Sequence, residues 1–385
     1  MDTQELRQLF SESIAECRER EAAAFDRVSE GAETEGLVLF GAGGLGRKTL
    51  RGLRSAGLEP LAFSDNNQSL WGQSIDGVRI LPPSEVASRY GKLATFVITI
   101  WAEWAGRMED QRQDLRKLGC QTVIPFTLLF WKFPGLFLPH IQVDLPSKVH
   151  EQASDVLRCA ELWADSTSYA TYLAQVRWRL YSDFESLTPP VDSMYFPTDL
   201  VDGIRLDENC TFVDVGAYDG DTIADFVVLT GGAFRRVYAF EPDTANFASL
   251  QQRLARMQES VRWRITPRQQ AVGDRNCLLS FTEGGGTGSR VGAGATTVEC
   301  VTLDSTISEA PTYMKFDVEG FEPEALEGAR EIITRYRPAL AVCVYHIQDH
   351  LWKLPLLIHS FNPRYRFYLR PHGQVWETVC YAVPA

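Results

Sequence analysis

The sequence predicts an α/β fold with two units, each built around a parallel sheet. Two short apolar runs, Gly36–Phe40 and Thr211–Val213, each end in a Gly-rich turn that is followed by a helical pattern of apolar residues. Further strand-like runs then alternate with helical stretches, as in parallel sheets whose crossovers are helices. A chain of 385 residues, 45% of them hydrophobic, is long for a single core and able to bury two.

The chain divides into four segments in sequence order. Apolar residues at helical spacing predict an amphipathic N-terminal helix over 1–35. A smaller, Rossmann-like α/β domain is expected over 36–146, and a helical linker follows over 147–204. The second α/β domain is expected over 205–385.

The first domain carries a Gly-x-Gly-x-x-Gly turn after its first strand, formed by Gly41, Gly43 and Gly46. Asp65 ends the next strand 19 residues later, where dinucleotide-binding folds hold a ribose. Three interpretations stay open: a scaffold or dimerisation domain, a site for a nucleotide or nucleotide sugar, and bound NAD. Residues 36–126 contain no His for hydride transfer, and the stretch 71–82 resembles the N-terminal domain of some sugar acyltransferases and sugar-modifying enzymes.

The second domain has a Gly-rich turn over 214–221 that lets backbone N–H groups approach a ligand. Glu241 ends the following strand, 21 residues after Gly220, the spacing typical of a carboxylate that binds a ribose diol. Together they predict a pocket for an adenosine-bearing cofactor. A third motif, Lys315–Glu322, places acidic groups at the carboxyl end of the fourth strand, where open α/β sheets bind ligands.

These motifs resemble, in order, those of the FkbM-type S-adenosylmethionine (SAM) methyltransferases. The resemblance spans roughly 205–385 and rests on the segments 214–217, 240–242, 271–273, 302–304, 315–322 and 345–346. It implies a class I Rossmann-like sheet with a terminal antiparallel hairpin around 371–373, and SAM as cofactor. It also implies methyl transfer to a hydroxyl of a sugar, glycan or natural product. A carboxyl acceptor is the alternative, and a third reading is a nucleotide-sugar or NAD-binding protein with an inactive second half.

The resemblance assigns the cofactor to residues of four strand ends. These residues are Asp214, Gly216, Ala217, Gly220, Asp221, Glu241, Pro242, Ala271 and Asp317. The turn is expected at the methionine end of SAM, Glu241 at the ribose, Ala271 beside adenine and Asp317 near the sulfonium. A carboxylate that caps the following helix is the other interpretation of Asp317. The sequence departs from the commonest turn in having Ala217 in place of a glycine.

For proton removal from a hydroxyl, His346 at the end of the fifth strand is the first candidate, since an ordinary imidazole suits base work at neutral pH. Glu319 is the alternative, and Asp317 completes the candidate catalytic set. A divalent metal could also be held by Asp317, Glu319, His346 and Asp349, but the sequence does not favour a metal.

Charge and composition indicate which classes of partner and which cellular location to expect. A net charge of −12 argues against nucleic acid as the principal partner, so a small-molecule or glycan substrate is expected. The apolar stretch 122–141 is interrupted by three prolines and a lysine and predicts no membrane span. Eight cysteines without a C-x-x-C pair, and no leader-like start, predict reduced thiols and a cytoplasmic protein. A homo-oligomer remains open.

One segment, 284–294, is too polar and Gly-rich to form a helix or strand. We expect it to be a loop that closes over the acceptor, with the substrate entering between the two α/β domains.

Overall fold

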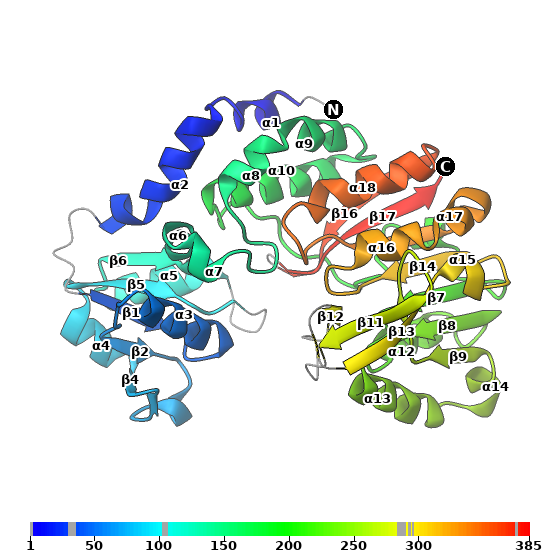
Figure 1. Cartoon of the computed structure of the whole chain (residues 1–385), viewed down its shortest axis with the longest axis horizontal. Coiled ribbons are helices and arrows are strands. Elements are labelled where there is room, and N and C mark those ends of the chain that lie inside the picture. The colour runs from blue at the N-terminus through cyan, green and yellow to red at the C-terminus, as the bar shows by residue number, and fades with distance from the viewer. Residues whose placement is uncertain are drawn as a thin grey trace. The chain divides into compact units, whose positions relative to one another are not determined.

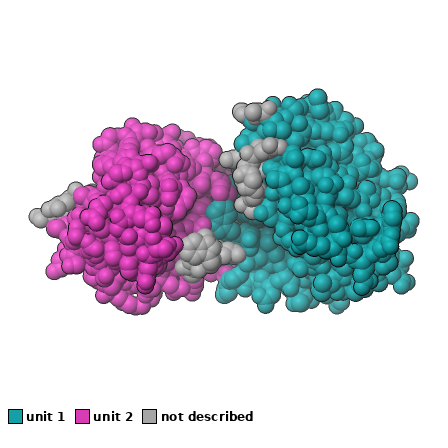
Figure 2. All heavy atoms as spheres, turned by 90° about the horizontal axis from the view of Figure 1, so that it is seen from below, with its two compact units in different colours: residues 1, 158–172, 189–385 teal, residues 2–157, 173–188 magenta. Residues whose placement is uncertain are grey.

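The computed structural model describes residues 3–29, 36–101, 107–282, 290–291, 294, 296–373 and 376–385. It contains two compact units, coloured in Figure 2. The N-terminal unit comprises residues 2–157 and 173–188, and the C-terminal unit comprises residues 158–172 and 189–385. The two units therefore share the helical segment that follows residue 146, and the predicted boundaries at 35, 146 and 204 remain predictions.

The N-terminal unit is built around a six-stranded sheet in the order β3-β4-β2-β1-β5-β6 (Figure 1). All neighbours pair in parallel except the short edge pair β3–β4. The predicted order of a first strand, a Gly-rich turn and a helix is present, because strand β1 is followed by helix α3. The strands are β1 Gly36–Phe40, β2 Ala62–Ser64, β3 Ser74–Ile75, β4 Val78–Leu81, β5 Ala94–Ile98 and β6 Thr122–Pro125.

Short helices complete this unit, and α2 packs against α6 and α8. Their bounds are α1 Gln4–Gln8, α2 Ile14–Ser29, α3 Gly44–Ser55, α4 Pro83–Tyr90, α5 Met108–Lys117, α6 Phe126–Lys132, α7 Pro134–Phe137 and α8 Pro146–Glu151. A 3-10 turn covers Gln68–Leu70. Helices α9 Ala153–Ala160 and α10 Ser166–Tyr181 run across the division into two units.

The C-terminal unit is built around a seven-stranded sheet in the order β16-β17-β15-β14-β7-β8-β9 (Figure 1). Strands β9, β8, β7, β14 and β15 run parallel, and β17 pairs antiparallel with both β15 and β16. This confirms the predicted Rossmann-like sheet with a terminal antiparallel hairpin. The strands are β7 Thr211–Val215, β8 Arg236–Phe240, β9 Ile265–Arg268, β14 Tyr313–Phe316, β15 Ala339–Cys343, β16 Tyr365–Pro371 and β17 Thr378–Pro384.

A second, four-stranded sheet in this unit corrects one expectation. The sequence placed Ala271 at the end of a strand beside the other cofactor residues, but the third strand of the main sheet, β9, ends at Arg268. Ala271 belongs instead to β10 Ala271–Val272, which pairs with β13 Thr296–Val301 in the order β10-β13-β11-β12. The other members are β11 Cys277–Thr282 and β12 Arg290–Val291. Strand β12 lies within the segment 284–294, which was expected to form no strand, and residues 284–289, 292 and 293 of that segment lie outside the described residues.

Helices cover the C-terminal unit, and α16, α17 and α18 pack on one another. The helix bounds are α11 Val201–Ile204, α12 Asp221–Leu229, α13 Thr244–Ala255, α14 Glu259–Arg262, α15 Leu303–Thr306, α16 Glu322–Glu327, α17 Arg330–Tyr336 and α18 His350–Phe361. Its core joins side chains of the central strands to the segment before the sheet, including Phe196, Phe212, Phe226 and Tyr313. The main sheet is thus buried and its strand ends are fixed by packing.

All eight cysteines are free, and all but Cys277 are buried. Among the described residues, no helix combines the length and apolar character that crossing a membrane requires.

Candidate active site

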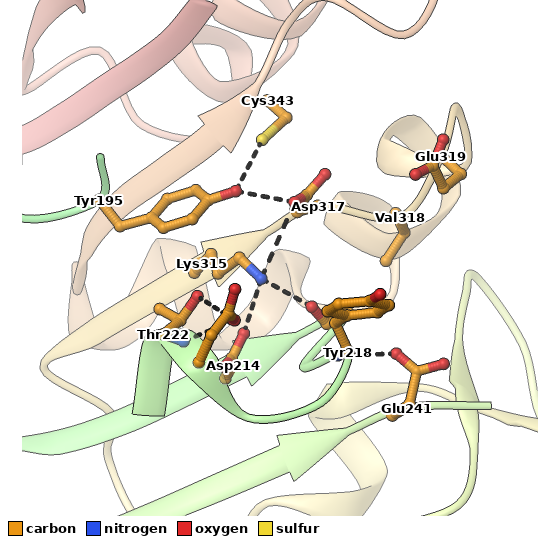
Figure 3. A network of polar contacts seen from close by, with 12 residues as sticks. Tyr195, Asp214, Tyr218, Thr222, Glu241, Lys315, Asp317, Val318, Glu319 and Cys343 are labelled. Atoms are coloured by element: carbon orange, nitrogen blue, oxygen red, sulfur yellow. Dashed lines mark hydrogen bonds and ion pairs between the residues drawn. The ribbon is translucent and has the colours of Figure 1, made fainter. Parts of the chain in front are cut away.

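The predicted site residues gather at the carboxyl edge of the main sheet. The parallel register aligns the ends of three strands, since Val215 lies opposite Phe240 on one side and Phe316 on the other. Phe316 in turn pairs with Val342 of β15. Polar residues that follow these strand ends therefore come together, as Figure 3 shows.

The turn after β7 approaches the end of β14 closely at Gly216. Gly216 has a φ of +85°, and a Cβ atom added there would lie 1.8 Å from the carbonyl oxygen of Asp317. Its own carbonyl oxygen accepts a hydrogen bond of 2.6 Å from Lys315 Nζ. Only glycine fits this position without moving a strand end.

Glu241 holds the other side of the turn. Its Oε2 accepts a 2.9 Å hydrogen bond from the backbone N–H of Tyr218, and its Oε1 accepts one of 2.9 Å from that of Asp243. Burial raises the pKa of Glu241 to about 7, although the two backbone N–H groups act in the opposite direction. The carboxylate predicted for the ribose therefore also fixes the shape of the Gly-rich turn.

A fully buried ion pair lies beneath the turn. Lys315 Nζ stands 3.0 Å from Asp214 Oδ1, and the two side chains are 3% and 0% exposed. Burial raises the pKa of Asp214 to about 6, against the stabilising effect of Lys315. Burial disfavours the charged form of Lys315 as well, but Asp214 and Asp317 outweigh it and raise the pKa of Lys315 above its ordinary value.

Asp317 and His346 meet at the ends of β14 and β15. His346 Nε2 lies 3.3 Å from Asp317 Oδ1 and 3.8 Å from Glu319 Oε2. On the other side of the ring, His346 Nδ1 is 2.7 Å from Oε1 of the fully buried Glu322. The Glu322 oxygen also accepts the backbone N–H groups of Val318 and Gly320 at 3.0 and 3.3 Å.

This surrounding changes the charge of His346. Burial by itself disfavours the imidazolium, but Glu322, and then Asp317 and Glu319, raise the pKa of His346 to about 9. The ring is therefore a cation at neutral pH with both nitrogens donating. Burial also disfavours the Glu322 carboxylate, yet His346 and His350 hold the pKa of Glu322 well below its usual range.

The family comparison agrees with this arrangement. Residues 214–374, from the turn after β7 to the hairpin, match the family model described as the methyltransferase FkbM domain. The chain carries an FkbM methyltransferase domain. The likeness to a methyltransferase thus concerns this part of the chain.

A solved structure shows the same fold. The crystal structure of methyltransferase FkbM from Methylobacillus flagellatus KT superposes with a TM-score of 0.74 at 24% identity, over 96% of this chain and 100% of that chain. A precorrin-6y C5,15-methyltransferase from Geobacter metallireducens GS-15 covers 51% of this chain and 94% of its own, at 11% identity and a TM-score of 0.31. A TM-score of 0.31 carries no argument about the fold of this chain. No curated protein matches the sequence.

The structure places the remaining predicted cofactor residues of the FkbM domain around the same turn. Ala217 is fully buried, and Gly220, with a φ of +84°, begins helix α12. Asp221 follows it on the first turn of α12, and Pro242 follows Glu241. Ala271 lies in the second sheet, so its predicted place beside adenine does not follow from the end of the third main strand.

The candidate metal ligands are only partly brought together. Asp317, Glu322 and His346 offer ligand atoms within 4.8 Å of one another, so Glu322 joins the predicted set. Asp349 instead pairs with Lys353 at 2.5 Å. Because Glu322 Oε1 already accepts two backbone N–H groups and the imidazole, the donor set fits a proton network better than a metal ion.

Three residues of the FkbM domain's site were not predicted: Lys315, Glu322 and Tyr195. Lys315 and Glu322 lie inside a quoted motif, where their polar side chains in an apolar setting were a usable signal. Tyr195 lies 122 positions from Asp317, yet its hydroxyl donates a 2.7 Å hydrogen bond to Asp317 Oδ2. Its sequence setting, Tyr195-Phe196-Pro197, resembles the segment that leads into the methyltransferase core in FkbM-type enzymes, which did not by itself place Tyr195 in the site.

The N-terminal turn has the local shape that its sequence predicts. A Cβ atom at Gly46 would lie 2.0 Å from the carbonyl oxygen of Gly41, whereas one at Gly43 would meet nothing within 4 Å. Asp65 Oδ2 accepts the backbone N–H of Ala42 at 2.8 Å, and its Oδ1 accepts that of Asn67 at 2.8 Å. A nucleotide at Gly41, Gly43, Gly46 and Asp65 remains a prediction.

Proposed function

We propose that this chain is a SAM-dependent O-methyltransferase whose acceptor is a hydroxyl of a sugar, glycan or other natural product. The observation that carries the proposal is the FkbM domain with Glu241 and Asp317 at the ends of β8 and β14, the two strands that flank β7. We further propose that it works in the cytoplasm, which the free thiols support.

The donor groups around the turn fit SAM. The open Gly-rich turn and Glu241 supply N–H donors and a carboxylate for the adenosine part, as in other adenosine-binding α/β folds. Asp317, with its side chain 23% exposed, would stand near the cationic end. SAM itself supplies an electrophilic methyl group on a sulfonium.

The charges of the site favour a cationic ligand. Each buried cation stands beside a buried carboxylate: Lys315 beside Asp214, and His346 beside Glu322. Asp317 and Glu319 then add negative charge on the more exposed side. A sulfonium is stabilised by such surroundings, whereas the neutral product S-adenosylhomocysteine gains less from them.

Calorimetric titration with SAM and with S-adenosylhomocysteine tests the cofactor. We expect both to bind to the full chain and both to raise its melting temperature. Absence of heat and of a thermal shift with either compound would refute the proposal. Turnover against a panel of nucleotide sugars, glycans and macrolides, followed by mass shift, then identifies the acceptor.

His346 distinguishes a hydroxyl acceptor from a carboxyl acceptor. A hydroxyl must lose its proton, and His346 accepts one only after losing its own, so the rate should rise with pH up to about 9. His346→Gln should remove this rise and lower kcat by about 10²- to 10⁴-fold. The matched control is His359→Gln, which changes a partly buried histidine of α18.

The alternatives give different pH profiles. A carboxyl acceptor needs no base, so a flat profile and an unchanged rate in His346→Gln would favour it. A rise that persists in His346→Gln would assign the proton to a group other than His346.

A further inference from the structure

Tyr195 is held in an unusual backbone conformation on the buried side of the site. Its φ is +69°, which is rare for an aromatic residue. Its backbone N–H donates to the hydroxyl of Tyr381 at 3.1 Å, and the hydroxyl of Tyr313 donates to its carbonyl oxygen. Both of these tyrosines are fully buried. Such an outlier persists only where the surroundings fix it, and is a reason to ask what the side chain does.

The side chain of Tyr195 reaches two charged groups of the site. Its hydroxyl donates a 2.7 Å hydrogen bond to Asp317 Oδ2, while its ring lies 4.9 Å from the Nζ atom of Lys315 (Figure 3). The sulfur of Cys343 is 3.5 Å from the same hydroxyl. Tyr195 is 7% exposed, so these contacts are made away from water.

Lys315 stands between two carboxylates. Its Nζ atom is 3.0 Å from Asp214 Oδ1 and 3.9 Å from Asp317 Oδ2. A small rotation of Asp317 would shorten the longer of these two ion pairs to hydrogen-bond distance and strengthen it. The charge of Asp317 would then be neutralised inside the protein. The hydrogen bond from Tyr195 to Asp317 Oδ2 opposes this rotation because it holds the same oxygen atom.

We propose that Tyr195 is a positioning residue of the methyl-transfer site: it keeps the Asp317 carboxylate turned toward the cationic sulfonium and away from the Lys315 ammonium. The proposal rests on the proposed function, since the ligand in question is SAM. It adds to the site a residue that precedes the matched segment 214–374. Its measurable consequence is charge selectivity: SAM should bind more tightly than the neutral product, and Tyr195 should be needed for this preference.

The test is calorimetric titration of the full-length wild type and of Tyr195→Phe with SAM and S-adenosylhomocysteine. The variant lacks only the hydroxyl. We expect the affinity for SAM to fall about tenfold, because a hydrogen bond to a charged group is lost, while that for S-adenosylhomocysteine changes by less than about threefold. Damage to the fold would lower both affinities alike.

Two controls make the result specific. Tyr365→Phe removes another buried hydroxyl, which donates to Pro338 O at 2.8 Å outside the site, and should leave both affinities unchanged. Asp317→Asn should abolish the preference for SAM, and adding Tyr195→Phe to it should cause no further change in the ratio.

The inference would be overturned if the ratio of the two affinities in Tyr195→Phe equals that of the wild type, whether both affinities stay the same or both fall by the same factor. If the wild type binds neither compound, the proposed function fails instead. A crystal structure of Tyr195→Phe then decides the role of Tyr195: Asp317 Oδ2 should lie about 3 Å from Lys315 Nζ, and an unmoved Asp317 refutes it.

Discussion

Replacing Gly216 with alanine tests the close approach on which the site is built. The new Cβ atom would lie 1.8 Å from the carbonyl oxygen of Asp317, whereas real Cβ contacts are essentially never under 3.0 Å. The two backbones must therefore separate by about 1.2 Å, the difference between these distances. The end of β14 resists this movement because Asp317 N donates to Val215 O at 3.0 Å.

The expected cost has two parts. A positive φ in a residue with a Cβ atom costs about 1–2 kcal/mol. Moving the strand end should add at least about 2 kcal/mol, as for other backbone distortions in a packed setting. Gly231→Ala is the matched control, because Gly231 has a φ of +58° in the same unit and nothing lies within 4 Å of its added Cβ atom. Gly231→Ala should lose only the stability that the positive φ costs.

Thermal unfolding with and without SAM measures both effects. The transition that SAM raises belongs to the C-terminal unit. Each kcal/mol should shift it by about 2–4 °C, so Gly216→Ala should melt roughly 6–16 °C below the wild type and the control roughly 2–8 °C below. SAM affinity should fall at least about tenfold in Gly216→Ala only. Equal melting of the two variants, with unchanged SAM binding, would show that the turn does not press on Asp317.

Two further predictions concern the buried charges. Because burial raises the pKa of Glu241 to about 7, the free protein holds a proton there below that pH, and SAM binding should release it; calorimetry in buffers of different ionisation enthalpy should detect this release. Glu241→Gln should abolish this proton release and lower the affinity for SAM at least about tenfold. The control Glu259→Gln, on exposed helix α14, should change neither. Proton release that persists in Glu241→Gln would assign the proton to another group. Lys315→Met should destabilise the C-terminal unit by about 3–5 kcal/mol because it leaves Asp214 buried without its partner, and Asp214→Asn in the same chain should recover part of the loss. The control Lys353→Met removes a half-exposed pair and should cost at most about 1 kcal/mol in thermal unfolding; equal losses in the two lysine variants would contradict the buried pair.

The order of strands and helices was predictable because it depends on local patterns. Apolar runs such as 211–213 and 339–343 form buried strands, and the Gly-rich turns open helices where the sequence places them. The placement of Ala271 at a strand end of the main sheet was wrong because two residues, Gln269 and Gln270, connect the main sheet to the second one. Nothing in their local sequence marks a change of sheet.

The candidate site was predictable at its strand ends and not across them. Asp214, Glu241 and Asp317 follow strands, so topology alone brings them to one edge. The contacts of Tyr195 join residues more than a hundred positions apart, and only the packed core fixes them. The charge of His346 was also out of reach, because it depends on Glu322, which the following helix places beneath the ring.

The carboxylates that follow the second strand of each unit have a consequence for how such sequences are interpreted. Asp65 in one unit and Glu241 in the other do the same thing: one oxygen accepts a backbone N–H from the Gly-rich turn, and the other accepts an N–H two residues further on. Each carboxylate thus preorganises its turn through two hydrogen bonds, so that ligand binding does not have to order the turn.

The same pair of hydrogen bonds would stabilise the turn in a domain that binds no ligand. A turn without it would leave backbone donors unpaired at the sheet edge. A Gly-rich turn with a trailing carboxylate is therefore a signature of a self-supporting turn first and of a nucleotide second. In this chain both units have this arrangement, so neither Asp65 nor Glu241 identifies a nucleotide site by itself.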